Sequence, residues 1–399
     1  MNPSASDRFD LILAGGGLAA CLAALRAAAA RPDLHVVVAE AQDTLAGDHF
    51  WSFHDTDVSP AQLAWLRPLV AHSWDRQRVR FPGRDRTLET GYNSVTSERL
   101  AAAVRALPNV EVVTGTPAAR VDADGITLAD QRRLTGTVLD ARGAVPSPHV
   151  SVGYQKFLGQ WIETDAPHGV TVPTIMDATV PQTDGYRFMY VLPLDARTLH
   201  VEDTYYADGD DLPEETLRAA IRDYAAREGW GPFRVTREET GVLPIVLEGD
   251  PAAYWAEIVG DGPAPLGMRG LLFNQITGYS LPLAAEAADA VAEEAAAGRL
   301  DPASLSRRLC SLSRDVWDRQ AFYRALNRML FRAAAPDQRY VVLRRHYGLS
   351  RGLIERFYAG RSTGLDKMRI LAGKPPVGIG AALRALPPRK LAGSAPHGG

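Results

Sequence analysis

Two adjacent acids, Glu202 and Asp203, lie in a run of strand-forming residues and are candidates for acid–base chemistry. Successive side chains of a strand point to opposite faces, so Glu202 shares a face with His200 and Thr204, and Asp203 points away. A carboxyl group among apolar neighbours has a raised pKa and can keep its proton near neutral pH. Only one of the two acids can readily face a substrate. The alternative, two solvated acids on a strand edge, is the commoner arrangement for an arbitrary Glu-Asp pair.

A glycine-rich turn near the N-terminus fits a dinucleotide-binding loop. The segment Gly15–Ala20 (GGGLAA) has the pattern G-x-G-x-x-[G/A] and lies between a predicted strand at Phe9–Ala14 and a predicted helix at Leu18–Ala30. Gly15 makes the tight turn, Gly17 lets the backbone approach a pyrophosphate, and a small last residue allows close packing of helix on strand. The diphosphate then lies at the helix N-terminus, where free N–H groups favour negative charge.

The acid that follows the second predicted strand narrows the choice of dinucleotide. Glu40 ends the segment His35–Glu40, and its carboxylate can accept a hydrogen bond from a ribose hydroxyl and repel a 2′-phosphate. This favours FAD or NAD over NADP. The alternative is a glycine-rich turn that binds no ligand.

A second helix start favours FAD. We predict a strand at Gly270–Phe273, a loop containing Thr277 and Gly278, and a helix at about Leu283–Ala297. In flavoproteins of this architecture the positive end of such a helix points at the flavin ring and stabilises an anionic reduced flavin. The alternative is an ordinary capped helix.

Other polar and aromatic residues carry weaker hypotheses. His49 and His54 resemble a metal-binding pair, but no thiolate or convincing third ligand is near them in the sequence, so we expect no metal there. Trp51 and Phe53 either line a substrate channel or belong to the core, and composition favours the core. Asp177 either positions a ligand or is a turn acid. Arg99 either reaches a pyrophosphate or is a solvated helix arginine.

The composition sets the limits for partners. The chain has 399 residues, 46% hydrophobic and 23% charged, which is ordinary for a folded protein. Its net charge of −3 argues against nucleic acid as a partner, since phosphate binding needs a positive excess. Two cysteines, Cys21 and Cys310, exclude a disulfide framework and fit a reducing cytoplasm. The apolar stretch Leu11–Ala30 is broken by glycines and Arg26, so any membrane contact is expected to be peripheral.

The C-terminal part is basic and apolar at once. From Arg339 to Lys390 there are twelve Lys or Arg residues against two acids. Such a segment either docks on an anionic bilayer or is a solvated basic face over a helical core. The basic residues are Arg344, Arg345, Arg351, Arg356, Arg361, Lys367 and Arg369, and the apolar ones are Leu343, Tyr347, Leu353, Ile354, Phe357 and Tyr358.

Between the two parts the pattern changes to alternating strands and turns. Segments such as Arg187–Pro193 and Thr198–Thr204 read as strands, with a helix at Pro213–Arg227 stopped by Gly229. From Ser151 to about Leu247 this predicts an antiparallel sheet within a dinucleotide-binding fold. Asp301 is predicted to cap a long helix.

Several motifs together resemble the bacterial lycopene β-cyclases. The segment Gly47–His54 (GDHFWSFH) is similar to their G-N-H-x-W-S-F-H signature, and the likeness runs from Phe9 to beyond Pro376. Two departures are Ala20-Cys21, where Asn-Gly is expected, and Asp48 in place of Asn. The other colinear motifs are Ile175–Thr179, Gly185–Phe188, Val201–Thr204, Thr277–Pro282, Asn327–Phe331, Arg356–Gly360 and Gly373–Pro376.

The resemblance implies an α/β fold. It consists of an FAD-binding Rossmann-like domain of the glutathione-reductase type, an inserted antiparallel-sheet substrate domain and a helical C-terminal region. The expected limits are 1–145 for the FAD-binding part with an aromatic insert, 146–265 for the substrate domain, 266–300 for the return to the FAD domain, and 301–399 for the basic helical region. The residues expected to hold FAD are Gly15, Gly16, Gly17, Leu18, Ala19, Glu40, Arg99, Thr277 and Gly278.

The resemblance also implies an activity. These enzymes are isomerases that close β rings at both ends of lycopene, through γ-carotene to β-carotene, with reduced FAD and with NADPH only as the electron source. Their acidic motif maps to Glu202–Thr204, which makes Glu202 the expected general acid and Asp203 a structural residue. A cytoplasmic protein at the inner membrane surface is expected. The alternatives are a flavin-dependent monooxygenase or reductase acting on an isoprenoid lipid, and a carotenoid-binding protein without catalysis.

Overall fold

The computed structural model describes residues 7–372 and 378–389, and its N-terminal part is built on a mixed sheet. Its central strands run parallel, and the strands Gly125–Leu128 and Ala118–Asp122 join them in antiparallel pairs. Strand β1 pairs in parallel with β2 on one side and with β11 on the other, and β2 pairs in parallel with β8. The apolar run of β1 is buried on both faces, as expected for a central parallel strand. The sheet order is β8 (Val110–Val113), β2 (Val36–Ala39), β1 (Arg8–Ala14), β11 (Arg133–Asp140), β10 (Gly125–Leu128) and β9 (Ala118–Asp122), with β17 (Ala264–Pro265) also on β11.

Two alanine-rich helices cover this sheet. Helix α1 (Leu18–Ala30) and helix α6 (Leu281–Ala296) pack against each other, although more than 250 residues of sequence separate them. Alanines on both helices are fully buried, and their small side chains allow the close approach. Arg26 of α1 is also paired with Asp289 of α6 at 2.8 Å. The predicted helices at both positions are confirmed.

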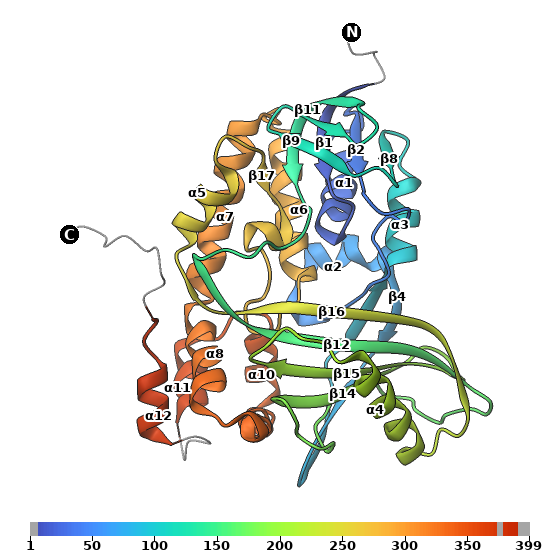
Figure 1. Cartoon of the computed structure of the whole chain (residues 1–399), viewed down its shortest axis with the longest axis vertical. Helices are drawn as coiled ribbons and strands as arrows, with labels where there is room; N and C mark the ends of the chain where they lie inside the picture. Colours follow the sequence, from blue (N-terminus) through green and yellow to red (C-terminus); the bar gives the residue numbers. More distant parts are fainter. Residues whose placement is uncertain (1–6, 373–377, 390–399) are drawn as a thin grey trace.

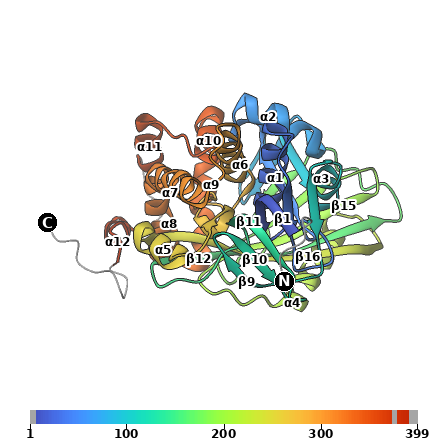
Figure 2. The same cartoon turned by 90° about the horizontal axis from the view of Figure 1, so that it is seen from above.

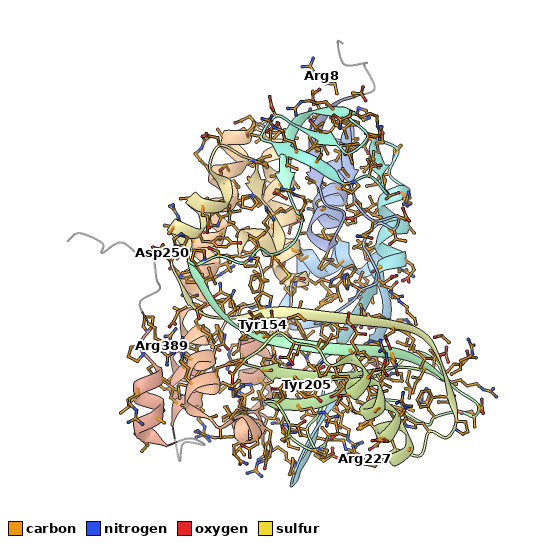
Figure 3. All side chains as sticks on the ribbon, in the orientation of Figure 1. Arg8, Tyr154, Tyr205, Arg227, Asp250 and Arg389 are labelled. Carbon is orange, nitrogen blue, oxygen red and sulfur yellow. The ribbon has the colours of Figure 1, made fainter. Side chains whose placement is uncertain are left out.

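A second, larger sheet lies beneath this layer and is mostly antiparallel (Figure 1). One face packs on helix α4 (Glu214–Arg227) through residues such as Tyr205, which Figure 3 labels beside that helix. The other face carries His200 and Glu202. The predicted strands and helix of this region are confirmed. The order is β16 (Phe233–Gly249), β12 (Val150–Thr164), β15 (Thr198–Ala207), β14 (Tyr186–Pro193), β13 (Thr174–Asp177), β5 (Gln77–Phe81) and β6 (Arg84–Leu88).

A small three-stranded sheet and helices complete the described chain. In Figures 1 and 2 the last helices gather at one side of the large sheet. Among the described residues, no helix combines the length and apolar character needed to cross a bilayer. The small sheet is β3 (Phe50–His54), β7 (Tyr92–Thr96) and β4 (Val70–Trp74). The helices are α2 (Pro60–Leu66), α3 (Ser97–Arg105), α5 (Pro251–Val259), α7 (Pro302–Arg319), α8 (Ala321–Ala333), α9 (Arg339–His346), α10 (Arg351–Tyr358), α11 (Gly364–Leu371) and α12 (Ile379–Ala385).

Three expectations need comment. The strand predicted at Gly270–Phe273 is wrong: a short 3-10 helix, Gly267–Gly270, ends at its first residue, Leu271 has a left-handed φ of 59°, and the residues up to Phe273 form no strand. The segment is apolar because it is buried, and a short buried run does not reveal its backbone shape. The cap predicted at Asp301 is confirmed, since its side chain accepts from the Ser304 N–H at 2.9 Å. The motif Gly373–Pro376 falls outside the described residues.

Candidate active site

One cavity of about 510 Å³ lies between the N-terminal sheet and the large sheet. We call it the main cavity. It joins the glycine-rich loop and the end of β2 to the upper face of β12, β15 and β16, so the dinucleotide motif and the acidic motif open into the same space. The residues that the following argument uses are Gly15, Gly17, Leu18, Ala19, Glu40, His49, Trp51, Arg142, Tyr190, Glu202, Glu239, Gly278 and Tyr279.

The glycine-rich loop has the space that a diphosphate requires. Gly15 has a φ of 100°, and a Cβ there would lie 2.8 Å from the carbonyl oxygen of Ala141, so the turn requires glycine. Gly17 precedes the first residue of α1, and a Cβ at Gly17 would meet no atom of the described chain within 4 Å, apart from its two neighbours in sequence. The N-terminus of α1 therefore faces the main cavity without a side-chain cap, which fits the binding of an anionic group.

Glu40 is held beside this loop by backbone donors. Its carboxylate accepts from the Gly16 N–H at 2.6 Å and from the Gln42 N–H at 2.9 Å. This fixes the acid at the end of β2, where the main cavity passes. A cationic side chain also lines this part: Arg142 makes two hydrogen bonds to Asp140, at 2.8 and 2.7 Å. Arg142 was not among the residues that the sequence singled out for the site.

The remaining predicted cofactor residues divide into two groups. Leu18, Ala19 and Gly278 line the main cavity. Thr277 is buried next to it, and its hydroxyl accepts from the Tyr279 N–H at 3.2 Å. Arg99 is not brought to the main cavity: it is exposed on α3, and its Nε donates to the carbonyl oxygen of Pro68 at 2.9 Å.

Glu202 lies on the floor of the main cavity. Its side chain is buried on β15, and the Thr204 hydroxyl donates a hydrogen bond to its Oε1. Burial raises the pKa of Glu202 to about 8, and the nearby charges of Glu239 and Asp203 act in the same direction. A carboxyl group with this pKa is mostly protonated at neutral pH and can act as an acid.

Asp203 and Asp177 do not reach the main cavity. Asp203 points to the opposite face of the sheet, where Arg187 donates two hydrogen bonds of 2.9 Å to its carboxylate. Asp177, at the end of β13, is fully buried, accepts from the Tyr224 hydroxyl at 2.8 Å and pairs with Arg80 at 2.8 Å. Both acids hold elements together in this structure.

A second buried carboxylate faces Glu202 and was missed by sequence reasoning. Glu239 of β16 lines the same cavity, and its Oε1 lies 3.3 Å from Nε2 of His200, although that contact lacks the angles of a hydrogen bond. His200, Glu202 and Glu239 can each place one ligand atom within 4.8 Å of the others, so these three could hold a metal ion. The closeness of Glu239 to Glu202 is evident only from the strand register, because both acids pair with Gly159 of β12.

The histidines and aromatic residues of the N-terminal motif are separated. His49 and Trp51 line the main cavity, and His49 Nδ1 lies 3.9 Å from Glu239 Oε2. His54 instead lies 3.1 Å from Asp57, and Phe53 is buried in the core. Trp51 thus fits a channel residue and Phe53 a core residue.

A smaller apolar cavity of about 130 Å³ lies between the large sheet and the last helices, and we call it the C-terminal cavity. Its lining includes Tyr206 of β15, two residues after Thr204, together with Thr277. Helix α11 supplies Ile370 and Leu371 at the other side. The two cavities are separate, but neighbouring residues line them, since Thr277 borders the C-terminal cavity and Gly278 the main cavity.

Comparison with known proteins gives a consistent result. A family model described as "Lycopene cyclase protein" matches residues 10–384. The chain is 49% identical over 383 residues to a "Lycopene beta-cyclase" of Paracoccus sp. (strain N81106 / MBIC 01143), covering 96% of this chain and 98% of that one. It is 46% identical over 377 residues to one of Pseudescherichia vulneris, covering 94% and 96%.

Solved structures with similar folds are more distant in sequence. A flavin-dependent brominase has a TM-score of 0.61 at 13% identity, covering 88% of this chain and 94% of that one. A p-nitrophenol 4-monooxygenase from Pseudomonas putida DLL-E4 has a TM-score of 0.59 at 16% identity, covering 89% and 99%. At these identities the likeness shows the fold alone, a mixed α/β fold shared with flavin-dependent enzymes.

Proposed function

The chain belongs to the lycopene cyclase family, and we propose that it closes β rings at the ψ ends of lycopene, giving γ-carotene and then β-carotene. The observation that carries this proposal is the main cavity, which brings the glycine-rich loop and the buried Glu202, whose pKa burial raises to about 8, into one space. A proton donor beside a flavin site is what a non-redox cyclisation of a polyene needs.

We propose FAD as the resident cofactor, kept reduced by electrons from NADPH. The groups that would hold it are the glycine loop at the N-terminus of α1, Glu40 for a ribose hydroxyl, and Gly278 before α6. Gly17 leaves room for the diphosphate and Arg142 lies close by in the lining. Reduced FAD bound there would supply negative charge that stabilises a cation without being consumed.

The chain's own residues carry the proton chemistry. Glu202 delivers its proton to the terminal double bond of the polyene, and the resulting cation closes onto a neighbouring double bond. Thr204 orients the carboxyl group through its hydrogen bond to Oε1. Trp51, Tyr190 and Tyr279 line the same space, and aromatic faces attract a cation as they exclude water. Loss of a proton from the new ring leaves the β end group.

We propose that one of the two seven-stranded sheets belongs to the FAD-binding part and the other to the substrate domain. Segments 1–145 and 266–300 would form the FAD-binding part, 146–265 an inserted substrate domain, and 301–399 the helical region. The parallel strands with α1 and α6 support the first assignment, and the sheet that carries Glu202 supports the second. Strands β5 and β6 come from the first segment yet pair within the large sheet, so the substrate domain would also include them.

We also propose a peripheral site at the inner membrane surface, centred on α11 and α12. Of the seven large apolar side chains that are exposed among the described residues, five lie on these two helices. They are Leu365, Met368, Leu371, Ile379 and Leu383. Exposed Arg369 and Arg384 alternate with them, a combination that suits an anionic bilayer. Tyr347, Leu353, Ile354 and Phe357, which the sequence suggested for docking, are instead buried.

Conversion of lycopene by the purified protein tests the proposed function. With FAD, a reductant and lycopene in vesicles, we expect a cyclic product of unchanged mass, and we expect Glu202→Gln to abolish it while FAD stays bound. Glu163→Gln, which removes an exposed acid of the neighbouring strand β12, is the matched control and should keep full activity. A product that has gained oxygen or hydrogen would point to the monooxygenase or reductase alternative. Full activity of Glu202→Gln would reject the proposed acid.

A further inference from the structure

We propose that Glu239 is a second catalytic residue, the base that removes the proton from the newly closed ring, with His200 as its partner. This inference rests on the proposed function, which requires one proton to be given to the polyene and another to be taken away. Glu202 accounts only for the first transfer.

The strand register places the two carboxyl groups side by side. Glu202 of β15 pairs with Gly159 of β12, and Gly159 pairs on its other side with Glu239 of β16. Glu202 and Glu239 therefore flank Gly159, a position of β12 that has no side chain. A Cβ on Gly159 would lie 2.6 Å from Nε2 of His200 and 3.5 Å from Cγ of Glu239. The glycine thus leaves the space in which the histidine and the two acids approach each other.

Glu239 differs from a structural acid in its partners. Its side chain is buried, yet among the described residues the basic groups within 4 Å of its carboxylate are two histidines, His200 at 3.3 Å and His49 at 3.9 Å. The adjacent Glu238 shows the contrast, because it binds Arg218 and Gln160 through several hydrogen bonds. A buried carboxylate without an arginine or lysine partner keeps the capacity to accept a proton.

His200 is suited to support such a base. Its ring stacks on Phe50 with centroids 5.4 Å apart and planes inclined by 13°, and it contacts Trp161 at 4.4 Å. Packing on both aromatic rings fixes the imidazole next to Glu239. The ring then helps to hold the Glu239 carboxylate in place, since Nε2 of His200 lies 3.3 Å from Oε1 of Glu239.

The proton balance closes within this cluster. Glu202 forms the new C–H bond and becomes a carboxylate, the ring closes, and a C–H bond of the cyclic cation breaks as Glu239 takes up its proton. The proton then passes from Glu239 to Glu202, because a carboxylate oxygen of one acid lies within 4.8 Å of a carboxylate oxygen of the other. Each cycle starts again with Glu202 protonated and Glu239 ionised, with no net uptake of protons or electrons.

The test compares Glu239→Gln with Glu238→Gln in the FAD-loaded enzyme, in D2O, with lycopene in vesicles. Glu238 precedes Glu239 on β16 but is paired with Arg218 away from the cavity lining, so its variant should cyclise as the wild type does. For Glu239→Gln we expect ring formation to fall by about 100-fold or more, the usual effect of losing a general base. Glu202 still delivers a deuteron to the substrate. When the unclosed chain turns so that an original hydrogen of the same carbon faces Glu202, loss of this hydrogen leaves deuterium in the recovered lycopene, and Glu202→Gln should give none.

The results of this experiment distinguish a failure of the Glu239 proposal from a failure of the proposed function. Normal cyclisation by Glu239→Gln, or inactivity without deuterium in the recovered lycopene, overturns the base. A wild type that forms no ring refutes the proposed function itself. If Glu239→Gln fails to bind FAD or to fold, Glu239→Asp replaces it, with reduced ring formation and deuterium exchange expected. A stoichiometric metal ion that is bound by the wild type and lost in either variant would make Glu239 a ligand and overturn the proposal.

Discussion

Glu202 and Asp203 are consecutive in sequence, yet the sheet gives them opposite environments. Glu202 faces the main cavity and has no Arg or Lys partner among residues 7–372 and 378–389, and burial raises its pKa to about 8. Asp203 faces α4 and forms a two-fold hydrogen-bonded ion pair with Arg187. The alternation of strand side chains thus turns one acid into a proton donor and the other into part of a structural pair.

We predict that Asp203→Asn lowers stability. Removing one partner of a buried ion pair leaves the Arg187 charge uncompensated, which costs about 3–5 kcal/mol. Chemical denaturation of the FAD-bound protein measures the change. Asp85→Asn, which breaks an exposed pair with Arg78, is the control and should cost about 0–1 kcal/mol. Equal effects of the two variants would show that the buried pair has no structural role.

At the scale of elements, the glycine loop gives a direct test of cofactor binding. A Cβ on Gly17 meets no atom of the described chain within 4 Å, apart from its two neighbours in sequence, and its φ of −73° is allowed for alanine. We therefore predict that Gly17→Ala leaves the melting temperature of the apoprotein unchanged but weakens FAD binding by at least about 10-fold. Titration of the apoprotein with FAD measures this.

Gly364→Ala at the start of α11, where a Cβ also meets open space, serves as the control and should bind FAD normally. If Gly17→Ala binds FAD as tightly as the wild type, the diphosphate does not lie on this loop.

Local patterns predicted most elements well. The first strand, helix and strand, the strands at Arg187–Pro193 and Thr198–Thr204, and the helix cap at Asp301 are encoded by neighbouring residues, through burial, alternation and capping. The strand at Gly270–Phe273 failed because an apolar run of four residues reports burial and not backbone shape.

The parts of the site that depend on pairing between distant segments could not be predicted in this way. Glu239 meets Glu202 only because β12 pairs with both β15 and β16 at Gly159. Likewise, nothing in the sequence near Gln77–Leu88 shows that this hairpin joins β13. Glu202 itself was found through the family motif, and its burial required the whole sheet.

On the scale of the molecule, the fold stacks a nucleotide-binding layer on a sheet that carries the acids, with the last helices at one side (Figures 1 and 2). Helix α11 contributes Ile370 and Leu371 to the C-terminal cavity and exposes Leu365 and Met368. A bilayer on this face would therefore lie next to the apolar lining of the C-terminal cavity.

We predict that Leu365→Glu combined with Met368→Glu reduces binding to vesicles containing anionic lipid by at least about 10-fold, because both side chains are exposed and each glutamate adds negative charge. Flotation of vesicles measures the bound fraction. Val235→Glu, at an exposed apolar residue of β16, is the control and should bind as the wild type does. Unchanged flotation of the double variant would place the membrane contact elsewhere.

The protonation of Glu202 is the central claim, and infrared difference spectra between the wild type and Glu202→Gln measure it most directly. The account predicts the band of a protonated carboxyl group at pH 7, because this pH lies below the raised pKa of Glu202 in the folded protein. The band should disappear as the pH rises through about 8. A carboxylate band at pH 7, with no protonated form until the solution is distinctly acidic, would contradict it.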